Sequence, residues 1–498
     1  MDKLKFNRRQ LFILSAASAG AVLLFQQQSG KTQTPTENQK VLPQVHASTE
    51  GLLALDLEAS YRTVNLGGIQ SDLLAYNGQI PGPRLEAKPG DTVRLRFTNN
   101  LNQPTNLHYH GLHVTPTGNA DNVFLEIPSG ETLTYEFTIP SNHPAGTFWY
   151  HPHLHGLVAE QLFGGLAGLF IVRGELDEIP EIKAAQEEFL VLKDFELDSN
   201  GRIVQFQPMS QMMGREGGLV TINGQVNPTF SIATGGLLRL RLVNASTSRF
   251  YRLELENHPL YLIATDGGSL SEPVEVRELL LSPGERAEVL VQGERESGKY
   301  RLLNLPYDRG GMGMMGGGMM GRGMMGGGMM GRGMRRENST QRNPETLATF
   351  TYSNSTASLP LPQKLIPIEA LPEPETVRRF EINHGMAPGM GMVFLINGQT
   401  YSHDRIDTQV RLNAVEDWEL VNTGVMDHPL HIHVNNFQIV SRNGRASPYR
   451  AWKDTVVVSP GETVRIRTRF ADFTGKTVYH CHILDHEDLG MMGTMEIT

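Results

Sequence analysis

The chain has 498 residues, enough for about two to four domains of ordinary size, and a formal net charge of -9 at pH 7. This acidic balance lacks the basic character of nucleic-acid-binding proteins, so we expect no nucleic acid partner. The single cysteine, Cys481, excludes an intramolecular disulfide, so core packing or metal must hold the protein together.

The N-terminal segment has the features of an export signal. The pair Arg8-Arg9 precedes a short apolar run from Leu11 to Phe25, which resembles a twin-arginine (Tat) signal. An ordinary secretory signal or an uncleaved anchor is the alternative. Gln, Ser, Thr and Pro then dominate, so we assign residues 1–50 to the signal and a flexible segment. We expect the mature protein in the periplasm or cell envelope, as a monomer without a stable membrane span.

From residue 51 onward the sequence is typical of β-structure. Short runs rich in Val, Leu, Ile, Thr and Phe alternate apolar and polar residues at period two, as in 91–100, 237–246 and 462–470. Helical periodicity is scarce. We therefore predict an all-β protein made of sandwiches or barrels.

Two short landmarks recur in the same order three times along this β-rich part. An Asn-Gly-Gln turn comes first and a Gly-Glu turn follows; their residues are Asn77 and Gly130, Asn223 and Gly284, and Asn397 and Gly461. One such turn is uninformative, but an ordered pair repeated three times predicts three β-domains of one fold. We place these domains at residues 51–176, 177–356 and 357–498, the last beginning with a Pro-rich linker.

A Met- and Gly-rich stretch with a ten-residue repeat lies within the second predicted domain. Asn223 and Asn397 are 174 residues apart and Asn77 and Asn223 are 146 apart, an excess of 28 that equals the length of 309–336. We interpret 309–336 as an insertion outside the domain core. Thioether sulfur favours Cu(I), so its paired methionines are candidates for handling that ion, with low-complexity filler as the alternative. These methionines are Met314, Met315, Met319, Met320, Met324, Met325, Met329 and Met330.

Ten of the 17 histidines lie in four short motifs, two in the first predicted domain and two in the third. Residues two apart on a strand point to the same face, so each His-x-His pair presents two imidazoles side by side. A site that uses all four motifs must lie where the terminal domains meet. The histidines are His108, His110, His151, His153, His428, His431, His433, His480, His482 and His486.

The motif around Cys481 indicates two metal centres on one strand. Cys481 points to one face, and the two flanking histidines point to the other. Two imidazoles, a thiolate and a weak axial methionine form a blue-copper electron-transfer site. His486 and Met491 lie close to Cys481 in sequence, and His428 is a candidate for the second imidazole. Zinc is the alternative metal, although structural zinc sites prefer paired cysteines.

The four motifs, in this order and at the two ends of a three-part β-chain, resemble the multicopper oxidases, the family of laccases and bacterial copper-efflux oxidases. The resemblance covers roughly residues 51–498. It implies three cupredoxin-like domains, each a Greek-key β-sandwich or barrel, and four copper ions as cofactors. The implied ligands are His428, Cys481, His486 and Met491 for type 1 copper, His108 and His431 for type 2 copper, and His110, His151, His153, His433, His480 and His482 for the type 3 pair.

The resemblance also implies the reaction. A reducing substrate supplies single electrons at type 1 copper, and O2 is reduced to water with four electrons and four protons. Buried proton delivery needs carboxylates, and Asp121 and Glu487 stand where similar members place such acids. A turn residue and a solvated acid are the alternatives for these two positions. Tyr109 replaces the commoner Trp between two ligands; it faces away from them, so we expect only an effect on packing.

Two reductants remain open on the sequence: Cu(I), as in copper detoxification, or phenols and aromatic amines, as in laccases. Met-rich segments are a feature of the copper-efflux members, and Met426 and Asp427 directly before His428 are candidates for Cu(I) docking. An axial Met resembles the lower-potential members and argues against substrates that are hard to oxidise.

A copper-free scaffold or cell-division-type envelope protein is the alternative of another class, disfavoured by the intact ligand positions. A two-domain nitrite reductase is disfavoured by the three repeats.

Overall fold

The computed structural model describes residues 43–310, 343–387 and 391–498. The expected export signal and the paired methionines of the insertion lie outside the described residues. Within the described ranges, no helix has the length and apolar character that crossing a membrane requires.

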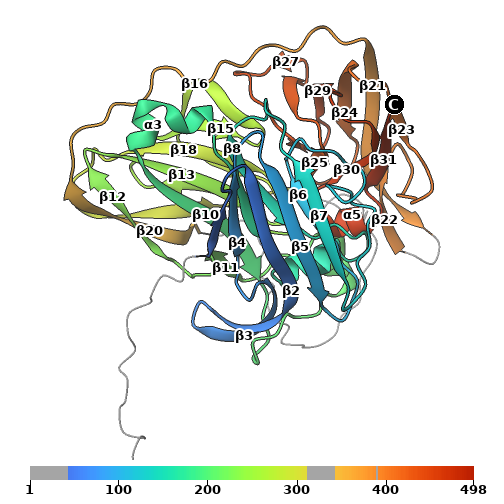
Figure 1. The fold of residues 1–498 in the computed structure, drawn as a ribbon, viewed down its shortest axis with the longest axis horizontal. Coiled ribbons are helices and arrows are strands. Elements are labelled where there is room, and N and C mark those ends of the chain that lie inside the picture. Colours follow the sequence, from blue (N-terminus) through green and yellow to red (C-terminus); the bar gives the residue numbers. More distant parts are fainter. Residues whose placement is uncertain (1–42, 311–342, 388–390) are drawn as a thin grey trace, which may run out of the picture. The chain divides into compact units, whose positions relative to one another are not determined.

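The described chain is dominated by strands that form six sheets (Figure 1). We call β1–β9, β10–β20 and β21–β31 the first, second and third β-unit. The first contains β1 (Val45–Ala47), β2 (Leu52–Leu66), β3 (Ile69–Tyr76), β4 (Gly82–Ala87), β5 (Thr92–Asn100), β6 (His108–His110), β7 (Thr132–Thr138), β8 (Gly146–His151) and β9 (Gly168–Val172). The second contains β10 (Gln186–Phe195), β11 (Leu219–Ile222), β12 (Thr229–Thr234), β13 (Leu237–Asn244), β14 (Tyr251–Leu255), β15 (Leu260–Thr265), β16 (Gly268–Val276), β17 (Leu279–Leu281), β18 (Arg286–Gln292), β19 (Lys299–Leu305) and β20 (Glu345–Ser355).

The third β-unit and the short helices complete the described elements. The unit contains β21 (Thr376–Ala387), β22 (Gly391–Ile396), β23 (Thr408–Val410), β24 (Val415–Asn422), β25 (His428–Ile432), β26 (Phe437–Arg442), β27 (Arg445–Ala446), β28 (Thr455–Val458), β29 (Thr463–Arg469), β30 (Gly475–Cys481) and β31 (Met492–Ile497). The helices are α2 (Val158–Gly164), η1 (Glu175–Glu178), α3 (Pro180–Ala184), α4 (Pro208–Met212) and α5 (Leu484–Asp488). Strand β1 pairs in parallel with β4, although it lies in the segment that we expected to be flexible.

The three β-units share one topology. In each, one sheet contains a parallel pair, β2–β5, β10–β13 or β21–β24, with an antiparallel neighbour, β7, β18 or β29. The second sheet contains the parallel pair β4–β9, β12–β20 or β23–β31, with β8, β19 or β30 antiparallel beside it. The prediction of an all-β chain with one fold repeated three times is therefore confirmed. The predicted boundaries fall between β9 and β10 and between β20 and β21.

The three Asn-Gly-Gln turns have one conformation. Asn77, Asn223 and Asn397 have φ angles of 49°, 54° and 53°, a left-handed region that asparagine and glycine adopt more readily than other residues. Each asparagine Oδ1 also accepts a backbone N–H from the strand beside the turn; the donors are Glu58, Val191 and Glu381. The repeated dipeptide thus marks a repeated tertiary contact.

A buried asparagine, absent from our sequence expectations, connects the second landmark to each unit. Asn99, Asn244 and Asn422 each accept at the backbone carbonyl the N–H of the landmark glycine, at 2.7, 3.0 and 2.9 Å. Their side-chain amides donate to carbonyls at the other side of the turn, at 2.8, 3.0 and 2.8 Å. Because buried amides are costly unless hydrogen-bonded, this residue locks the turn onto the strand.

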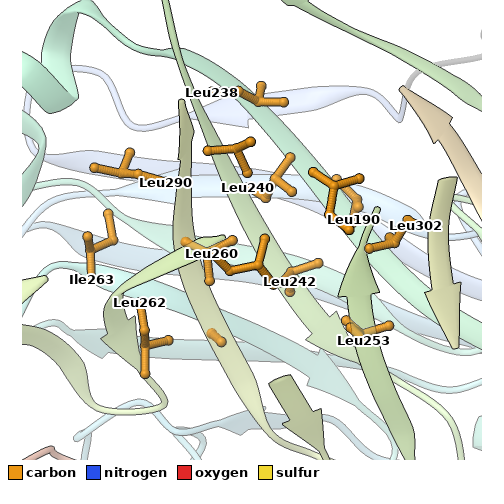
Figure 2. Close-up of a cluster of buried hydrophobic side chains, with 14 of the residues drawn as sticks. Leu190, Leu238, Leu240, Leu242, Leu253, Leu260, Leu262, Ile263, Leu290 and Leu302 are labelled. Atoms are coloured by element: carbon orange, nitrogen blue, oxygen red, sulfur yellow. The ribbon is translucent and has the colours of Figure 1, made fainter. Parts of the chain in front are cut away.

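Strand β13 shows how alternation places side chains on two faces. Leu238, Leu240 and Leu242 point into the apolar core of the second unit (Figure 2). Arg239 and Arg241 lie on the opposite face, where both are buried. The period of two seen in the sequence therefore divides this strand between a hydrocarbon core and a charged interface.

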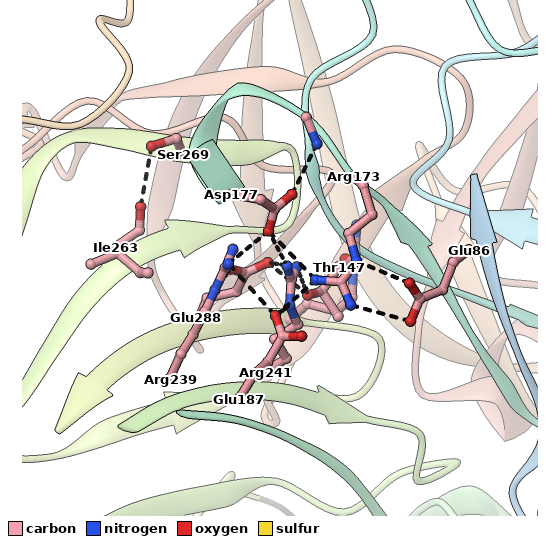
Figure 3. A network of polar contacts seen from close by, with 12 residues as sticks. Glu86, Thr147, Arg173, Asp177, Glu187, Arg239, Arg241, Ile263, Ser269 and Glu288 are labelled. Atoms are coloured by element: carbon pink, nitrogen blue, oxygen red, sulfur yellow. Dashed lines mark hydrogen bonds and ion pairs between the residues drawn. The ribbon is translucent and has the colours of Figure 1, made fainter. Parts of the chain in front are cut away.

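The charged interface joins the second unit to the first (Figure 3). Arg239 and Arg241 donate to Glu288 at 2.5 and 2.7 Å and to Asp177 at 2.7 and 2.6 Å. The Thr147 hydroxyl, on β8 of the first unit, also donates to Glu288 at 2.7 Å. Burying these charges costs free energy that only complete pairing offsets.

We predict that Glu288→Ala lowers the free energy of unfolding by about 3–5 kcal/mol, because two buried guanidinium groups lose a carboxylate partner. The midpoint of denaturant unfolding measures the change. Glu136→Ala is the control, since its partner Arg94 is exposed and the midpoint should hardly move. Equal midpoints for the two variants would contradict the role of the network.

Candidate metal centre

Four strands carry the histidine motifs. β6 pairs antiparallel with β8 in the first unit, with His108 opposite His151. β25 pairs antiparallel with β30 in the third unit, with His431 opposite His480. These are equivalent strand pairs of the two units, so the common fold supplies two similar platforms for imidazoles.

Imidazoles of the first and third units stack on one another. The ring centroids of His108 and His433 are 4.0 Å apart, and those of His110 and His431 are 3.9 Å apart. The structure thus brings together the eight histidines that we expected to form one cluster, and it buries all of them. They are His108, His110, His151, His153, His431, His433, His480 and His482.

The cluster contains three triads of nitrogen donors. In each triad the donor atoms lie within 4.8 Å of one another, close enough to hold a metal ion. The triads are His108, His110 and His431; His110, His151 and His482; and His153, His433 and His480. The second and third triads contain the six residues expected to bind the type 3 pair, and the first contains both expected type 2 ligands.

Hydrogen bonds orient two of the rings and leave one nitrogen of each without a partner in the described part of the chain. His108 Nδ1 lies 2.9 Å from Asp121 Oδ1, and His151 Nδ1 lies 2.9 Å from the Pro152 carbonyl. The Nε2 atoms of both rings are buried and have no hydrogen-bond partner among the described residues. Metal-binding histidines commonly donate their second N–H to a carboxylate or carbonyl, so these rings fit metal ions.

Burial also keeps His153 and His482 in the neutral form that binds metal. It lowers the pKa of His153 to about 3 and, together with neighbouring imidazoles, holds the pKa of His482 well below its usual value. A neutral imidazole keeps a lone pair on one nitrogen, so the cluster is prepared for metal at neutral pH.

A second donor group lies on the other side of β30. His428 Nδ1 is 3.5 Å from Cys481 Sγ, His486 Nδ1 is 3.8 Å from the same sulfur, and the two nitrogens are 3.3 Å apart. Met491 is buried, and its carbonyl accepts the N–H of Cys481 at 3.0 Å. Two imidazoles and a thiolate directed to one point form the donor set of a blue-copper site.

The strand alternation around Cys481 separates the two centres, as the sequence predicted. The Cys481 sulfur belongs to the second donor group, whereas His480 Nε2 lies 3.1 Å from His433 Nε2 in the cluster. His482 also belongs to the cluster. His480 and Cys481 are neighbours in β30, so a single peptide bond connects the two donor groups covalently.

The two predicted carboxylates contact cluster histidines. Asp121 Oδ1 also accepts the Tyr109 N–H at 2.9 Å, and burial raises the pKa of Asp121 to about 8. Glu487 Oε2 lies 3.3 Å from His480 Nδ1, and burial raises the pKa of Glu487 well above its usual value. Glu487 is buried, so it is not a solvated acid. Tyr109 packs in the apolar core of the first unit, as expected for a residue that faces away from the histidines.

Asp454 and Arg286 are site residues that sequence reasoning missed. Asp454 Oδ1 lies 3.1 Å from His110 Nε2, and Arg286 donates to both oxygens of Asp454 at 2.8 and 2.6 Å. Gly111 makes room for them: its φ is 88°, and a Cβ there would lie 2.1 Å from Arg286 Nη2. No motif in a single sequence marks this pair, because Arg286 belongs to the second β-unit and Asp454 to the third.

Met426 and Asp427 are both buried next to the second donor group. Asp427 Oδ2 accepts a hydrogen bond of 2.6 Å from the Tyr307 hydroxyl, and burial raises the pKa of Asp427. Their role in Cu(I) docking stays a prediction.

Comparison with known proteins agrees with this geometry. Models of the multicopper oxidase family match residues 58–177, 191–313 and 371–498. A solved multicopper oxidase from Campylobacter jejuni, described as a metallo-oxidase, is 32% identical, with 92% of this chain and 94% of that chain covered and a TM-score of 0.79.

Curated relatives include proteins of two kinds. The multicopper oxidase mco of Staphylococcus haemolyticus is 29% identical over 86% of this chain and 84% of that protein. The cell division protein FtsP of Proteus mirabilis is 27% identical over 99% of both chains. The complete donor sets favour the first kind. This chain therefore belongs to the multicopper oxidase family, whose members use copper to couple oxidation of a reducing substrate to reduction of O2.

Proposed function

We propose that this multicopper oxidase holds four copper ions and that its reducing substrate is Cu(I). Family membership supports copper, O2 and a reductant. The copper count, the ligand assignment, the proton donors and the identity of the reductant form our proposal. The Arg8-Arg9 signal supports action in the periplasm or cell envelope, where Cu(I) oxidation would serve copper homeostasis.

The ligand assignment follows the donor groups. His428, Cys481, His486 and Met491 would hold type 1 copper, His108 and His431 type 2 copper, and the remaining six cluster histidines the type 3 pair. When bound, these ions supply one-electron transfer and the redox equivalents for O2 reduction. The protein contributes positioning, since hydrogen bonds hold the rings of His108, His151 and His431 before metal arrives.

Two carboxylic acids are suited to proton delivery. Each oxygen of Glu487 faces a cluster histidine, at 3.3 Å from His480 Nδ1 and 3.7 Å from His153 Nδ1. A raised pKa keeps Glu487 and Asp121 protonated at neutral pH, so each holds a proton that it can donate beside the cluster.

One observation carries the assignment of Cu(I): the Met-rich stretch adjoins the type 1 ligands at its N-terminal end. Gly310, the last residue before it in the described structure, forms a β-bridge with Met426. The Arg309 carbonyl accepts the Asp427 N–H at 2.7 Å. Asn343, at the other end, lines the same small cavity as Arg309. The stretch with ten methionines thus follows in the sequence directly after Gly310, which bridges to Met426, two positions before His428.

The type 1 imidazoles are shielded from bulky substrates. His428 and His486 are fully buried, and His486 Nε2 lies 3.2 Å from the Met212 carbonyl. A phenol or aromatic amine would need an open imidazole edge, whereas a small ion needs only ligand side chains nearby. The overall reaction would oxidise four Cu(I) to four Cu(II) while O2 and four protons form two waters.

Removal of the thiolate tests the type 1 assignment. We expect Cys481→Ser to lose the blue absorption and one copper ion per chain while it keeps the other three, because serine cannot supply a thiolate. Copper analysis and visible spectroscopy measure both. Persistent blue colour would refute the assignment.

Substitution of the acids tests proton delivery. We expect Glu487→Gln to lower turnover by about 100-fold or more with any reductant and to leave copper content unchanged, because the amide cannot release a proton at neutral pH. Asp121→Asn should act in the same direction. Glu496→Gln, on β31, is the control with no expected effect, and a normal rate for Glu487→Gln would count against the proposal.

Changes in the Met-rich stretch test the substrate. We expect replacement of the ten methionines of 312–334 by leucine to lower Cu(I) oxidation and to leave phenol oxidation unchanged, because length is kept and only sulfur is lost. Deletion of 312–334 should lower Cu(I) oxidation and spare or raise phenol oxidation. Oxygen uptake measures both activities, and equal losses for the two substrates, or none, would argue against a cuprous role.

A further inference from the structure

The backbone turns sharply directly after His433. The Asn435 N–H donates to the His433 carbonyl at 2.7 Å, which closes a three-residue turn with Val434 at its centre. Val434 has a φ angle of 67°, in the left-handed region. Branching at Cβ makes this region costly for valine, and three-residue turns with a positive central φ are rare and strained. Contacts from the surroundings must therefore hold Val434 in this conformation.

The equivalent position of the first β-unit holds a glycine. His110 ends the His-x-His motif of β6, as His433 ends the corresponding motif of the third unit. Gly111, which follows His110, has a φ angle of 88°. Both motifs are thus followed by a left-handed residue, a conformation that glycine adopts at no steric cost. Valine lacks this freedom, so the third unit needs a contact that stabilises the turn.

His113 of the first unit supplies this contact. Its Nδ1–H donates to the Val434 carbonyl at 2.8 Å, and its Nε2 lies 2.9 Å from Asp472 Oδ2. A carbonyl and a carboxylate both accept, so His113 makes both bonds only when both of its ring nitrogens carry hydrogen. The His113 backbone N–H donates to His143 Nε2 at 3.0 Å, and the Phe473 ring lies beside the imidazole, with centroids 5.0 Å apart. We call His113 and Asp472 the latch.

Asp472 is also the centre of a tight turn. Its φ angle is 68°, and the Phe473 N–H donates to the Ala471 carbonyl at 2.8 Å. Both acceptors of the His113 ring therefore belong to three-residue turns of the third unit. Such short turns have few alternative conformations, so they fix the directions from which the ring is held.

The His433 ring depends on its backbone for its direction. Its Nδ1 is buried and has no hydrogen-bond partner among the residues that the structure describes, and its Nε2 faces His480 Nε2 at 3.1 Å. His108 and His151, in contrast, are held through Nδ1 by a carboxylate and a carbonyl. Apart from its stack on His108, the His433 ring is thus oriented by the turn at Val434.

We propose that His113 is a positioning residue that acts through the Val434 carbonyl, an inference that rests on the proposed ligand role of His433. It holds the turn that directs His433 toward the triad with His153 and His480. Residues that orient a ligand without touching the metal typically change metal affinity by about 10- to 100-fold when they are lost. His113 lies three residues after His110, so the latch also joins the two β-units whose imidazoles stack in the cluster.

Two substitutions of His113 separate its bond to Val434 from its ion pair with Asp472. In His113→Asn the amide nitrogen replaces Nδ1 and keeps the bond to Val434, whereas in His113→Gln it replaces Nε2 and keeps only the contact with Asp472. His258→Gln is the matched control, because its ring nitrogens also contact a backbone carbonyl and a hydroxyl, but in the second unit, which supplies no cluster histidine. Retained blue absorption establishes that each variant is folded.

The release of copper into an excess of chelator is measured on the copper-loaded, full-length protein. We expect His113→Gln to release one copper ion per chain about tenfold or more faster than the wild type, because the turn is no longer held. His113→Asn and His258→Gln should release copper as slowly as the wild type. Equal release rates for the Asn and Gln variants of His113 would overturn the positioning role.

A glycine at position 434 tests the strained turn itself. Val434→Gly removes the steric cost of the left-handed φ, so the turn no longer needs the latch. We expect the double variant His113→Gln with Val434→Gly to release copper slowly again, and Val434→Gly alone to resemble the wild type. A double variant that releases copper as fast as His113→Gln would refute the action through the turn.

Removal of the proposed ligand distinguishes a failure of this inference from a failure of the proposed function. If His433→Ala keeps the full copper content, His433 is not a ligand, and the proposed assignment fails together with the positioning role. If His433→Ala loses a copper ion but His113→Gln releases copper at the wild-type rate, the positioning role is wrong and the proposed assignment stands.

Discussion

The Asp454 carboxylate is the contact on which the cluster geometry depends. It lies on the third β-unit, meets His110 of the first and is held through both oxygens by Arg286 of the second. Burial favours the neutral acid, but the charge of Arg286 and the hydrogen bonds of the histidines hold the pKa of Asp454 well below its usual range. A permanent carboxylate can therefore fix one imidazole and bind all three units at the same point. The second unit supplies no cluster histidine, yet its Arg286 holds the carboxylate that contacts His110.

The connection between the last two strands of each β-unit carries different residues in the three units. The connection from β8 to β9 carries His153 and α2, and the one from β30 to β31 carries α5 with His486 and Met491. The equivalent connection from β19 to β20 contains the Met-rich stretch, and its described end bridges to Met426. Because the strands around these connections share one topology, one position in the fold carries cluster histidines, the proposed type 1 ligands and the proposed Cu(I)-gathering stretch. Variation of a loop on a retained scaffold is the general way in which folds acquire function.

Contacts between units also fix the position of α5, and with it the position of one donor group relative to the other. Asp488 on α5 accepts backbone N–H groups of Gly156 and Ala159 at the start of α2, at 2.7 and 2.9 Å. Arg215 donates to both oxygens of Asp485, so α5 is also tied to the second unit. The helix that carries His486 and Glu487 is thus fixed from two sides. Rigid support of this kind holds the proposed metal ligand His486 and the proposed proton donor Glu487 in place without help from a metal.

The sequence by itself determined the β-architecture, its three repeats and the sorting of Cys481 from its flanking histidines, because strand alternation and turn chemistry are local properties. The sequence also predicted which histidines lie together in the cluster, since metal ligands recur as particular residue types at short spacings. Only the tertiary structure decided that Asp454 and Arg286 orient the cluster and that Asp427 accepts a hydrogen bond from Tyr307. It also decided that the Phe394 ring lies between His384 and His486. Those contacts join residues far apart in the chain, and their energies depend on burial. A sequence pattern gives neither the distance between two residues nor their burial. The same residue types therefore cannot be identified as partners before the fold brings them together.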